Sequence, residues 1–374
     1  SPASARKSFY KKNNIEGLIP QRLSHCRGLQ RLSAGDNQFY GSIPKFLGSF
    51  SEFKHLNIQG NRFTGTIPVA LAILTKLEWF ILSQNKVHGN IPPELGGLTR
   101  LKAFSMQMNN LTDTLPESLF NLSTLWGLSY TINQLTGHLP KDSGCFLPNL
   151  QQLYMGKNNF DGPLAACLSN STRLQVLSAE SNKFSGLIQL ELGKLSQLKQ
   201  LSLWGNMLTN VPGNCELSIL TSLTRCQMLE GIYLLHNLLN GILPASVGNL
   251  TSTLSELILS SNQIESTIPL ALANLTKLIA LDLSSNKIKG LIPPNIGQMH
   301  NLQILQFNKN ALEGSIPLSN YQLVRMYAFD IRHNMLTGSI SSSIKNLTSL
   351  QMHSLSSNNL SSTLPPGLCE LKDL

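Results

Sequence analysis

The sequence predicts an α/β solenoid, a right-handed superhelix of about fifteen repeats with a parallel sheet on its concave side. Three observations predict it. An Asn followed two places later by an apolar residue recurs in steps of 24 or 25 residues, with one step of 31. Apolar residues alternate before each of these Asn residues, and a Gly follows four places after the Asn in eleven of the fifteen copies. Each copy is therefore expected to be one structural unit that stacks on the next.

The repeated motif reads L-x-x-L-x-L-x-x-N-x-L-x-G-x-I-P-x-x-L-x-x-L, and residues 278–301 are a clean copy. It is the pattern of a leucine-rich repeat. The repeated Asn residues, here called the ladder asparagines, are Asn13, Asn37, Asn61, Asn85, Asn109, Asn133, Asn158, Asn182, Asn206, Asn237, Asn262, Asn286, Asn310, Asn334 and Asn358. The Gly is replaced by Asp113, Asn210, Ser266 and Ser362.

Each motif position has a physical role. In a short strand, alternating apolar residues such as Leu281 and Leu283 point inward. The ladder Asn turns inward as well, and its amide is expected to bond backbone groups of its own turn and of the neighbouring turn. The Gly permits the tight path out of that turn, and Ile-Pro fixes an extended segment. The remaining residues are expected to return along the convex side as a short helical turn. Replacing Asn286 by Ala is predicted to cost about 1–3 kcal/mol.

Domain organisation follows from the repeat. We expect a degenerate N-terminal remnant of a repeat over residues 1–12 and one leucine-rich-repeat domain over residues 13–374, truncated at both ends, with a seven-residue insertion near residues 207–228. The chain is thus expected to be a fragment of a longer product. Its net charge of +9 leans on the first 31 residues, which is more typical of a solvated solenoid end than of a nucleic-acid site. No apolar run approaches the ~20 residues that span a bilayer.

Cysteines and glycosylation sequons both depend on repeat phase. Cys26 and Cys226 share one phase eight repeats apart, so they cannot bridge each other, and they are expected to be small buried fillers. Cys215 and Cys226 are either two free thiols, the favoured interpretation, or a local disulfide. Sequons start at Asn110, Asn121, Asn170, Asn249, Asn274, Asn346 and Asn359. Four of them, at residues 121, 249, 274 and 346, read N-L-S/T on the convex side, which favours a secretory route.

No catalytic constellation is present. The sequence contains no Gly-rich phosphate loop ending in Lys-Ser/Thr, no H-E-x-x-H, no G-x-S-x-G and no kinase H-R-D or D-F-G. His353 replaces an inward Leu and is interpreted as a tolerated core defect rather than as a ligand. The chain itself is therefore predicted not to be an enzyme and to need no cofactor or metal.

Binding is predicted on the concave face, where all three tryptophans of the chain fall. The candidate ligand-binding residues are Trp79, Trp126, Tyr154, Trp204 and Tyr233. The competing interpretation is that some of these rings only pack along the sheet. A mixed polar rim accompanies them, made of Lys54, His55, Glu78, Lys102, Lys157, Lys199 and Glu230, while Arg332 stands alone rather than in an arginine pair. Clustered exposed aromatics are typical binding anchors, so Trp126→Ala and Trp204→Ala are each predicted to weaken partner binding by about 1 kcal/mol or more.

The G-x-I-P signature resembles the plant-specific type of leucine-rich repeat, which occurs in receptor kinases, kinase-less receptor-like proteins and secreted polygalacturonase inhibitors. Residues 137–164 and 217–269 narrow the resemblance through "LPNLQQL" and the enlarged repeat "LTSLTRCQML". They resemble the receptor-kinase subfamily that contains the plant receptors for bacterial flagellin and elongation-factor peptides and the rice bacterial-blight resistance receptor. The seven extra residues then correspond to a family-specific insertion in the loop after Asn206.

That resemblance implies the ectodomain of a plasma-membrane receptor-like kinase, which binds a peptide or protein for defence or developmental signalling and recruits a smaller leucine-rich-repeat co-receptor kinase. It also implies a transmembrane helix and a Ser/Thr kinase outside this sequence, and a location on the extracellular side of the plasma membrane or secretion to the cell wall. The acidic and aromatic residues usual in the insertion are replaced by "PGNCELSIL". Two alternatives remain: a kinase-less receptor-like or secreted protein, such as an inhibitor of a wall-degrading enzyme, and a partial gene product.

Overall fold

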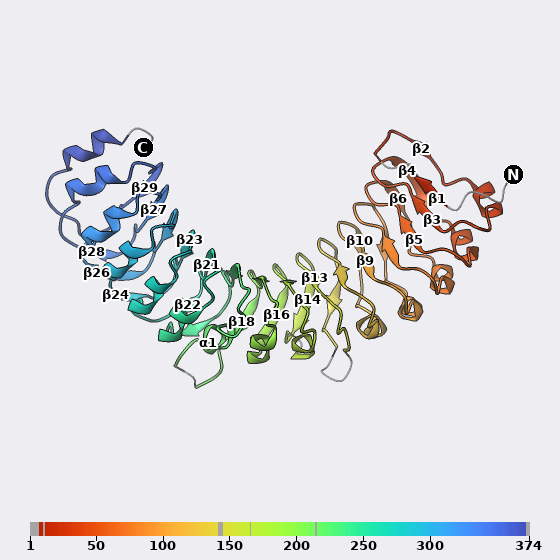
Figure 1. The fold of residues 1–374 in the computed structure, drawn as a ribbon, viewed down its shortest axis with the longest axis horizontal. Helices are drawn as coiled ribbons and strands as arrows, with labels where there is room; N and C mark the ends of the chain where they lie inside the picture. The colour runs from red at the N-terminus through yellow and green to blue at the C-terminus, as the bar shows by residue number, and fades with distance from the viewer. Residues whose placement is uncertain (1–6, 10–11, 141–144, 165, 214, 372–374) are drawn as a thin grey trace. The chain divides into compact units, whose positions relative to one another are not determined.

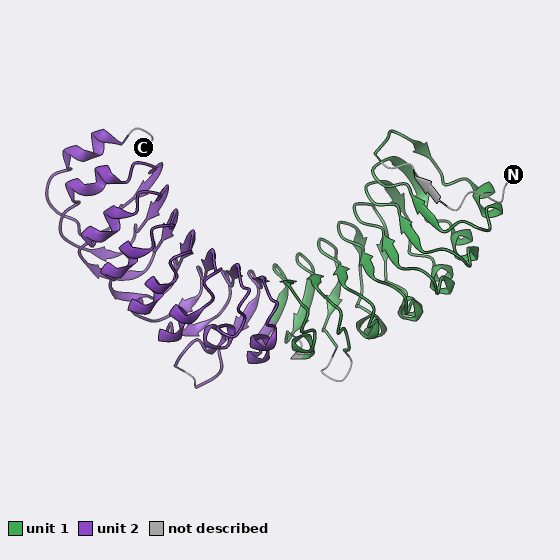
Figure 2. Cartoon of the chain, viewed as in Figure 1, with its two compact units in different colours: residues 1–184 green, residues 185–374 purple. Residues whose placement is uncertain are grey.

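The computed structural model describes residues 7–9, 12–140, 145–164, 166–213 and 215–371. The chain forms two compact units, residues 1–184 and residues 185–374 (Figure 2). In each unit one strand per repeat pairs in parallel with the strand of the next repeat, in chain order (Figure 1). This confirms the leucine-rich-repeat solenoid. The division into two units was not foreseen, and the proposed boundary between the remnant and the repeat domain stays a prediction.

The strands of this main sheet are short and lie at the same place in each repeat. In the first unit they are β1 (Lys7–Phe9), β3 (Arg31–Ser33), β5 (His55–Asn57), β7 (Trp79–Ile81), β9 (Ala103–Ser105), β11 (Gly127–Ser129), β13 (Gln152–Tyr154) and β15 (Val176–Ser178). In the second unit they are β17 (Gln200–Ser202), β19 (Gly231–Tyr233), β21 (Glu256–Ile258), β23 (Ala280–Asp282), β25 (Ile304–Gln306), β27 (Ala328–Asp330) and β29 (Met352–Ser354). The surface of these strands that points away from the core is called the sheet face below.

Smaller strands follow the ladder asparagines and form short parallel ladders beside the core. They are β2 (Glu16–Gly17), β4 (Gln38–Ser42), β6 (Arg62–Thr64), β8 (His88–Gly89), β10 (Asn110–Leu111), β12 (Thr136–Gly137), β14 (Asn159–Gly162), β16 (Lys183–Leu187), β18 (Met207–Thr209), β20 (Asn240–Gly241), β22 (Gln263–Ile264), β24 (Lys289–Leu291), β26 (Ala311–Gly314) and β28 (Met335–Leu336). Such ladders use backbone groups that the tight turn would otherwise leave unpaired.

The predicted helical turns are 3-10 turns of five residues each. They are η2 (Gln21–His25), η3 (Lys45–Ser49), η4 (Val69–Ile73), η5 (Pro93–Gly97), η6 (Glu117–Asn121), η8 (Ala166–Asn170), η9 (Leu190–Lys194), η10 (Ala245–Asn249), η11 (Leu270–Asn274), η12 (Pro294–Gln298), η13 (Leu318–Gln322), η14 (Ser342–Asn346) and η15 (Pro366–Glu370). Most are preceded by the Pro of the motif, whose ψ near 130° ends the extended segment, as Pro68 does with ψ 125° before η4.

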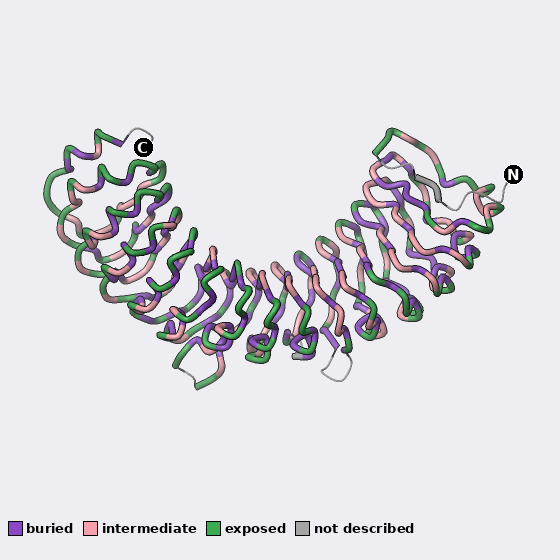
Figure 3. Tube along the Cα trace, in the orientation of Figure 1, coloured by how far each residue is buried: buried purple, intermediate pink, exposed green. Residues whose placement is uncertain are grey.

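Apolar residues of the motif form a continuous core inside each unit, and buried positions alternate with exposed ones along every coil (Figure 3). Leu281 and Leu283 are fully buried, as predicted. The ladder prediction is confirmed as well. The amide nitrogen of Asn85 donates to the carbonyls of Ile58 and Leu82 at 3.0 Å, and its Oδ1 accepts from the Phe63 N–H at 3.0 Å. One side chain thus bonds its own turn and the turn before it.

Backbone conformation explains the Gly and reveals a second requirement. Gly of the motif takes positive φ, for example +77° at Gly89, and Asp113 adopts +64° in its place. The residue directly before each ladder Asn is also left-handed, and there it is rarely Gly. Ile132 holds φ +59° at that position, which is costly for a β-branched residue. Sequence reasoning missed this requirement because no residue type marks it.

The long step in the repeat contains more than the loop that was predicted. After β18 the chain leads into α1 (Ser218–Leu223), which takes the place of a 3-10 turn and buries Leu220 and Leu223 completely. Before α1, the Ile242 N–H donates to the Cys215 carbonyl at 2.7 Å, and the Leu217 N–H donates to the Ile242 carbonyl at 2.9 Å. The insertion is thus held against the next repeat by a parallel bridge and a helix. Strand phase resumes at the buried Leu229, as predicted.

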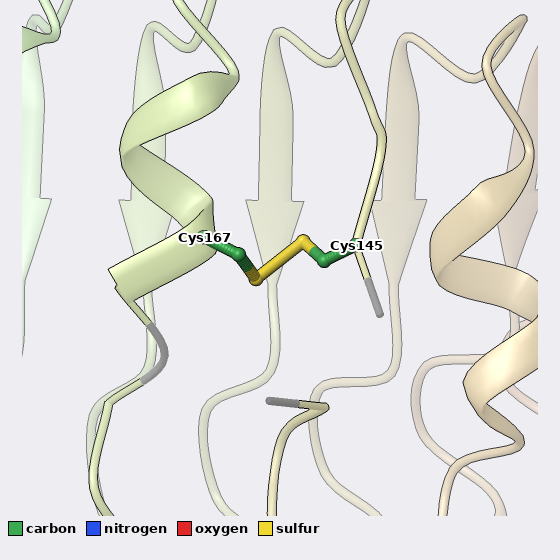
Figure 4. Close-up of a disulfide and its surroundings, with 2 residues drawn as sticks. All are labelled: Cys145 and Cys167. Carbon is green, nitrogen blue, oxygen red and sulfur yellow. A yellow bond between two sulfur atoms is a disulfide. The ribbon is translucent and has the colours of Figure 1, made fainter. Parts of the chain in front are cut away.

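The structure confirms the favoured interpretation of Cys215 and Cys226 as free thiols and the burial of Cys226, and it adds a disulfide that was not predicted. Cys145 and Cys167 form a disulfide with their Cα atoms 5.9 Å apart, a pair that sequence phase did not suggest (Figure 4). Cys215 and Cys226 are both free thiols, so the alternative of a disulfide between them is wrong. Cys226 is fully buried, and burial raises the pKa of its thiol to about 11. Cys26 is only half-buried, which corrects its expected burial: it caps the C-terminal end of η2, a turn with no buried residue.

Candidate functional site

The five aromatic residues proposed for binding fall into two groups. In the first unit, Trp79 begins β7, Trp126 directly precedes β11 and Tyr154 ends β13. In the second unit, Tyr233 ends β19 and Trp204 follows β17 by two residues. The middle residues of these strands are buried in the core, so Trp79, Tyr154 and Tyr233 beside them lie on the sheet face. Trp126 and Trp204 each follow a buried Leu, Leu125 and Leu203, and turn outward as well. All five are half-buried there.

Trp79 and Trp126 contact each other although their strands are not neighbours. Their ring centroids lie 5.7 Å apart with the planes at 70°, an edge-to-face arrangement. The register explains how they meet: Trp79 pairs with Ala103, and Ala103 pairs with Gly127, so two small residues lie between the indoles. Ala103 is only 6% exposed although it lies on the sheet face. The two indoles therefore form one aromatic cover over a floor of small residues.

A hollow of about 240 Å³ opens beside this pair. Its floor consists of small residues on two adjacent strands, β9 and β11: Ala103, Ser105, Gly127 and Ser129. Trp79, Trp126 and Tyr154 stand around it, together with Ile81, Gln107 and Gln152. Burial raises the pKa of the Tyr154 hydroxyl, which marks that ring as partly withdrawn from water. We call this feature the aromatic hollow.

Positive charge borders the aromatic hollow. Lys102 precedes Ala103 of its floor, and its Nζ lies 2.8 Å from Oε2 of Glu78. That hydrogen bond lowers the pKa of the Glu78 carboxyl, and the charges of Lys102, Lys54 and Arg31 lower it further. The carboxyl is thus ionised in neutral solution, with Lys102 in contact with it and with the charges of Lys54 and Arg31 acting on it from farther away.

His55 lies between the charged Arg31 and the indoles. Its ring centroid lies 5.9 Å from that of Trp79. Burial lowers the pKa of His55, and the charge of Arg31 lowers it further, so the imidazole is neutral at pH 7. Within the described part of the chain, no carboxylate lies within 4 Å of the charged group of Arg31 or of Lys54. Three cations thus act on Glu78.

Two further carboxylates lie nearby. Glu52 is paired with Lys76, and the charge of Lys54 also acts on it. Glu180 accepts a hydrogen bond from Ser178 on the strand beside Tyr154.

In the second unit the aromatic residues have another environment. The Tyr233 hydroxyl donates to Oε2 of Glu256 at 2.9 Å, and burial together with this partner raises its pKa to about 12. Lys199 lies 3.6 Å from Glu230, and Arg332 lies 3.2 Å from Asp330. Sequence reasoning treated all five aromatics as one set, whereas the structure gathers three of them around the aromatic hollow.

Two further predicted positions are placed as follows. Lys157, expected in the polar rim, is exposed at the left-handed position before Asn158. His353 occupies the inward position of β29, where its ring stacks on Phe329 at 5.8 Å and its Nε2 has no hydrogen-bond partner among the described residues. Burial lowers its pKa to about 4. These features fit a polar residue in a core position.

The sequon asparagines are all exposed. Those at residues 121, 170, 249, 274 and 346 each end a 3-10 turn, on η6, η8, η10, η11 and η14. Asn170 thus joins the four that share a phase in the sequence. Asn110 begins β10, and Asn359 follows a ladder asparagine directly. None of the seven lies on a strand of the main sheet, so glycans there would leave the sheet face open.

No helix in the described ranges has both the length and the apolar character needed to cross a membrane.

Comparison with known proteins supports the repeat assignment. A leucine-rich-repeat family model matches residues 252–312, and a second one matches residues 52–74. Over 142 residues the chain is 33% identical to the LRR receptor-like serine/threonine-protein kinase EFR of Arabidopsis thaliana, an alignment that covers 38% of this chain and 14% of that kinase. A putative receptor-like protein kinase of the same organism is 35% identical over 141 residues, with the same two coverages. The chain thus matches about a seventh of the length of each curated relative.

Solved structures extend the likeness to the whole chain. The plant peptide hormone receptor RGFR1, solved in complex with RGF2, is 32% identical and superposes with a TM-score of 0.91 over 98% of this chain and 58% of that one. The Arabidopsis receptor kinase HAESA, solved with the peptide hormone IDA and the co-receptor SERK1, is 27% identical with a TM-score of 0.86 over 100% and 65%. The chain has the leucine-rich-repeat solenoid fold, and it resembles the ectodomains of plant leucine-rich-repeat receptor kinases.

Proposed function

We propose that this chain is the extracellular ligand-recognition module of a plasma-membrane receptor-like kinase, and that it binds a peptide or protein on its sheet face. The observation that carries the proposal is the aromatic hollow. Trp79, Trp126 and Tyr154 converge there on a floor without large side chains, and indole and phenol rings in such clusters dominate binding energy at interfaces. The rings are preorganised by their mutual contact, which lowers the entropy cost of binding.

Two further features support the proposal. The plant peptide hormone receptor RGFR1 was solved in complex with RGF2, and HAESA was solved with the peptide hormone IDA and the co-receptor SERK1. Here we propose the same classes of partner, in defence or developmental signalling. Exposed sequons that all lie outside the main sheet agree with an extracellular chain whose glycans leave its binding surface free.

The test uses the secreted, glycosylated chain immobilised on a surface. A size-fractionated peptide extract of plant apoplastic fluid is passed over it, and the retained peptides are identified by mass spectrometry and resynthesised. Their affinities are then measured by calorimetry for the unchanged chain and for Trp126→Ala. We expect the substitution to weaken binding at least tenfold, which is about 1.4 kcal/mol.

Two matched aromatic controls sharpen that result. Tyr40→Ala removes an exposed ring on β4, away from the sheet face, and should leave affinity unchanged. Trp204→Ala removes a sheet-face ring in the second unit and reports whether that unit contributes to binding. If no retained peptide loses affinity on Trp126→Ala or on Trp79→Ala, the aromatic hollow is not the binding site and the proposal fails.

A further inference from the structure

We infer that the aromatic hollow takes one aromatic or large aliphatic side chain from a peptide whose neighbouring residues are acidic. This inference rests on the proposed function and specifies its ligand. It is carried by two properties of the first unit that occur side by side: a small hollow with apolar walls, and an excess of positive charge along its border.

Size selects the occupant of the hollow. Its volume of about 240 Å³ lies below the range of ~300–1,000 Å³ that is usual for pockets holding small molecules or cofactors. It suits a single large side chain. The indole faces of Trp79 and Trp126 and the phenol of Tyr154 offer such a side chain apolar and edge-to-face contacts. Small polar groups of Ser105 and Ser129 on the floor leave room for it without closing the space.

The charged residues beside the hollow determine which peptide residues can flank that side chain. Lys102 adjoins the floor, and its neighbours along the sheet face in the preceding repeats are Glu78, Lys54 and Arg31. Glu78 already accepts a hydrogen bond from Lys102, so the carboxylate of this group is engaged while the charges of Arg31 and Lys54 stay available. His55 between them is neutral because burial and Arg31 lower its pKa. An acidic segment that runs from the hollow toward β3 passes the three cations Lys102, Lys54 and Arg31, which attract it and would repel a basic segment.

The test uses four capped pentapeptides, each with two identical residues on either side of a central one. The first has a central phenylalanine flanked by glutamates. The others replace the phenylalanine by alanine, the glutamates by lysines, or the glutamates by glutamines. Affinities for the full chain are measured by tryptophan fluorescence and confirmed by calorimetry. We expect the glutamate–phenylalanine peptide to bind at least about tenfold tighter than the lysine peptide, and to lose affinity as salt is raised from 0.05 to 0.5 M.

Variants of the chain separate the two parts of the inference. Gly127→Leu fills the hollow from its floor, and the backbone leaves room for a side chain there because a Cβ at this Gly meets no atom within 4 Å. It should abolish the advantage of phenylalanine over alanine. Lys54→Glu should abolish the advantage of glutamate over glutamine. Arg62→Glu makes the same change of charge on β6, outside the sheet face, and should preserve both preferences.

Each outcome has one meaning. Equal binding of the glutamate and lysine peptides, still sensitive to Gly127→Leu, would overturn the acidic assignment and leave the proposed binding site intact. Equal binding of the phenylalanine and alanine peptides would overturn the role of the hollow. If none of the four peptides binds, the inference is wrong, and the proposed function is judged separately by the extract-derived peptides and Trp126→Ala.

Discussion

The sheet faces of the two units differ in their charged residues and in the presence of the aromatic hollow, although both units are built from the same repeated motif. In the first unit, Arg31, Lys54 and Lys102 lie at strand positions on one side of the aromatic hollow and act on Glu78, while Glu180 follows β15 by two residues. The corresponding surface of the second unit carries four carboxylates on or next to its strands, namely Glu230, Glu256, Asp282 and Asp330. Its Tyr233 is bonded to one of them.

The core beneath these faces does not differ in the same way. Phe80 in the first unit and Leu281 in the second occupy the same inward strand position, and both are fully buried. Asn85 and Asn286 make the same set of bonds in the two units. The comparison teaches that the repeat constrains the inward positions, where packing and backbone bonding decide, and leaves the outward positions free to acquire different chemistry. The predictions that follow test how far the two units are alike in stability.

Of the changes considered, loss of the disulfide should produce the largest difference in stability between the two units. Cys145→Ser with Cys167→Ser removes a cross-link between residues 22 apart. Because such a cross-link lowers the entropy of the unfolded chain, its loss should lower the free energy of unfolding by about 3 kcal/mol. Only the first unit should lose stability, because both cysteines belong to it. Hydrogen exchange followed by mass spectrometry would resolve the two units, with β13 and β15 losing protection and β23 and β25 keeping theirs. Equal loss in both units would show that they unfold as one.

Replacing a ladder asparagine should affect both units alike. In the second unit, the Asn286 amide nitrogen donates to the carbonyls of Leu259, Leu283 and Ser284 at 3.1 Å, and its Oδ1 accepts from the Ile264 N–H. Asn286→Ala leaves these groups unpaired and should cost about 1–3 kcal/mol. Asn85→Ala should cost a similar amount in the first unit. Urea unfolding checks both, and a neutral result for either would contradict the ladder mechanism in that unit.

Acid should weaken the second unit through His353. Its pKa is about 4 in the folded chain because of burial, below the value of ~6.5 in an unfolded chain, so the unfolded state binds more protons between these values. Stability is therefore complete above about pH 6.5 and falls as pH drops toward 4, by up to about 2 kcal/mol at pH 5. His353→Leu should remove this dependence. Protection of β29 against hydrogen exchange, corrected for intrinsic rates, provides the measurement at pH 7 and pH 5.

Replacing a buried amide in η13 should raise the stability of the second unit, because the same position in a turn of the first unit already holds Leu. Asn320 is fully buried, and neither its Oδ1 nor its Nδ2 has a hydrogen-bond partner in the described structure. The same position of η4 holds Leu71, and that of η11 holds Leu272. Asn320→Leu should therefore stabilise the second unit by about 1–2 kcal/mol, whereas Leu71→Asn should destabilise the first. Thermal unfolding of both variants would test this, and a lowered midpoint for Asn320→Leu would show that the amide has a partner.

The sequence predicted most of the fold because the repeat is a local code. Strands, ladder asparagines and convex turns each depend on residues within one 24-residue copy, so they could be placed by phase. α1 and the bridge between Glu216 and Ile242 could not be placed in this way, because an insertion has no repeat phase. The same limit hid the disulfide. Cys145 and Cys167 lie at different positions of adjacent repeats, and only the folded path brings them together.

The candidate site was predicted in its residues but not in its geometry. Phase placed Trp79, Trp126 and Tyr154 on one face. That the two indoles meet depends on what lies between them, namely Ala103 and Gly127 at paired strand positions. Small residues between aromatic ones were the signal available in the sequence. This signal can be used only when the strand register is known, because small residues form a hollow only where they lie side by side on paired strands.

The smallest predicted effect concerns the left-handed residue before each ladder asparagine. Both units require positive φ there, and the second unit meets the need with residues such as Ser261 and Ser285, while the first uses Ile132 at φ +59°. A branched Cβ crowds the carbonyl in that conformation, so Ile132→Asn should relieve strain and stabilise the first unit by about 0.5–1 kcal/mol. Ser285→Asn is the matched change without a branched side chain and should be nearly neutral. If urea unfolding shows Ile132→Asn to be destabilising, contacts of the half-exposed isoleucine outweigh its backbone strain, and the residue is held there by packing on the sheet face.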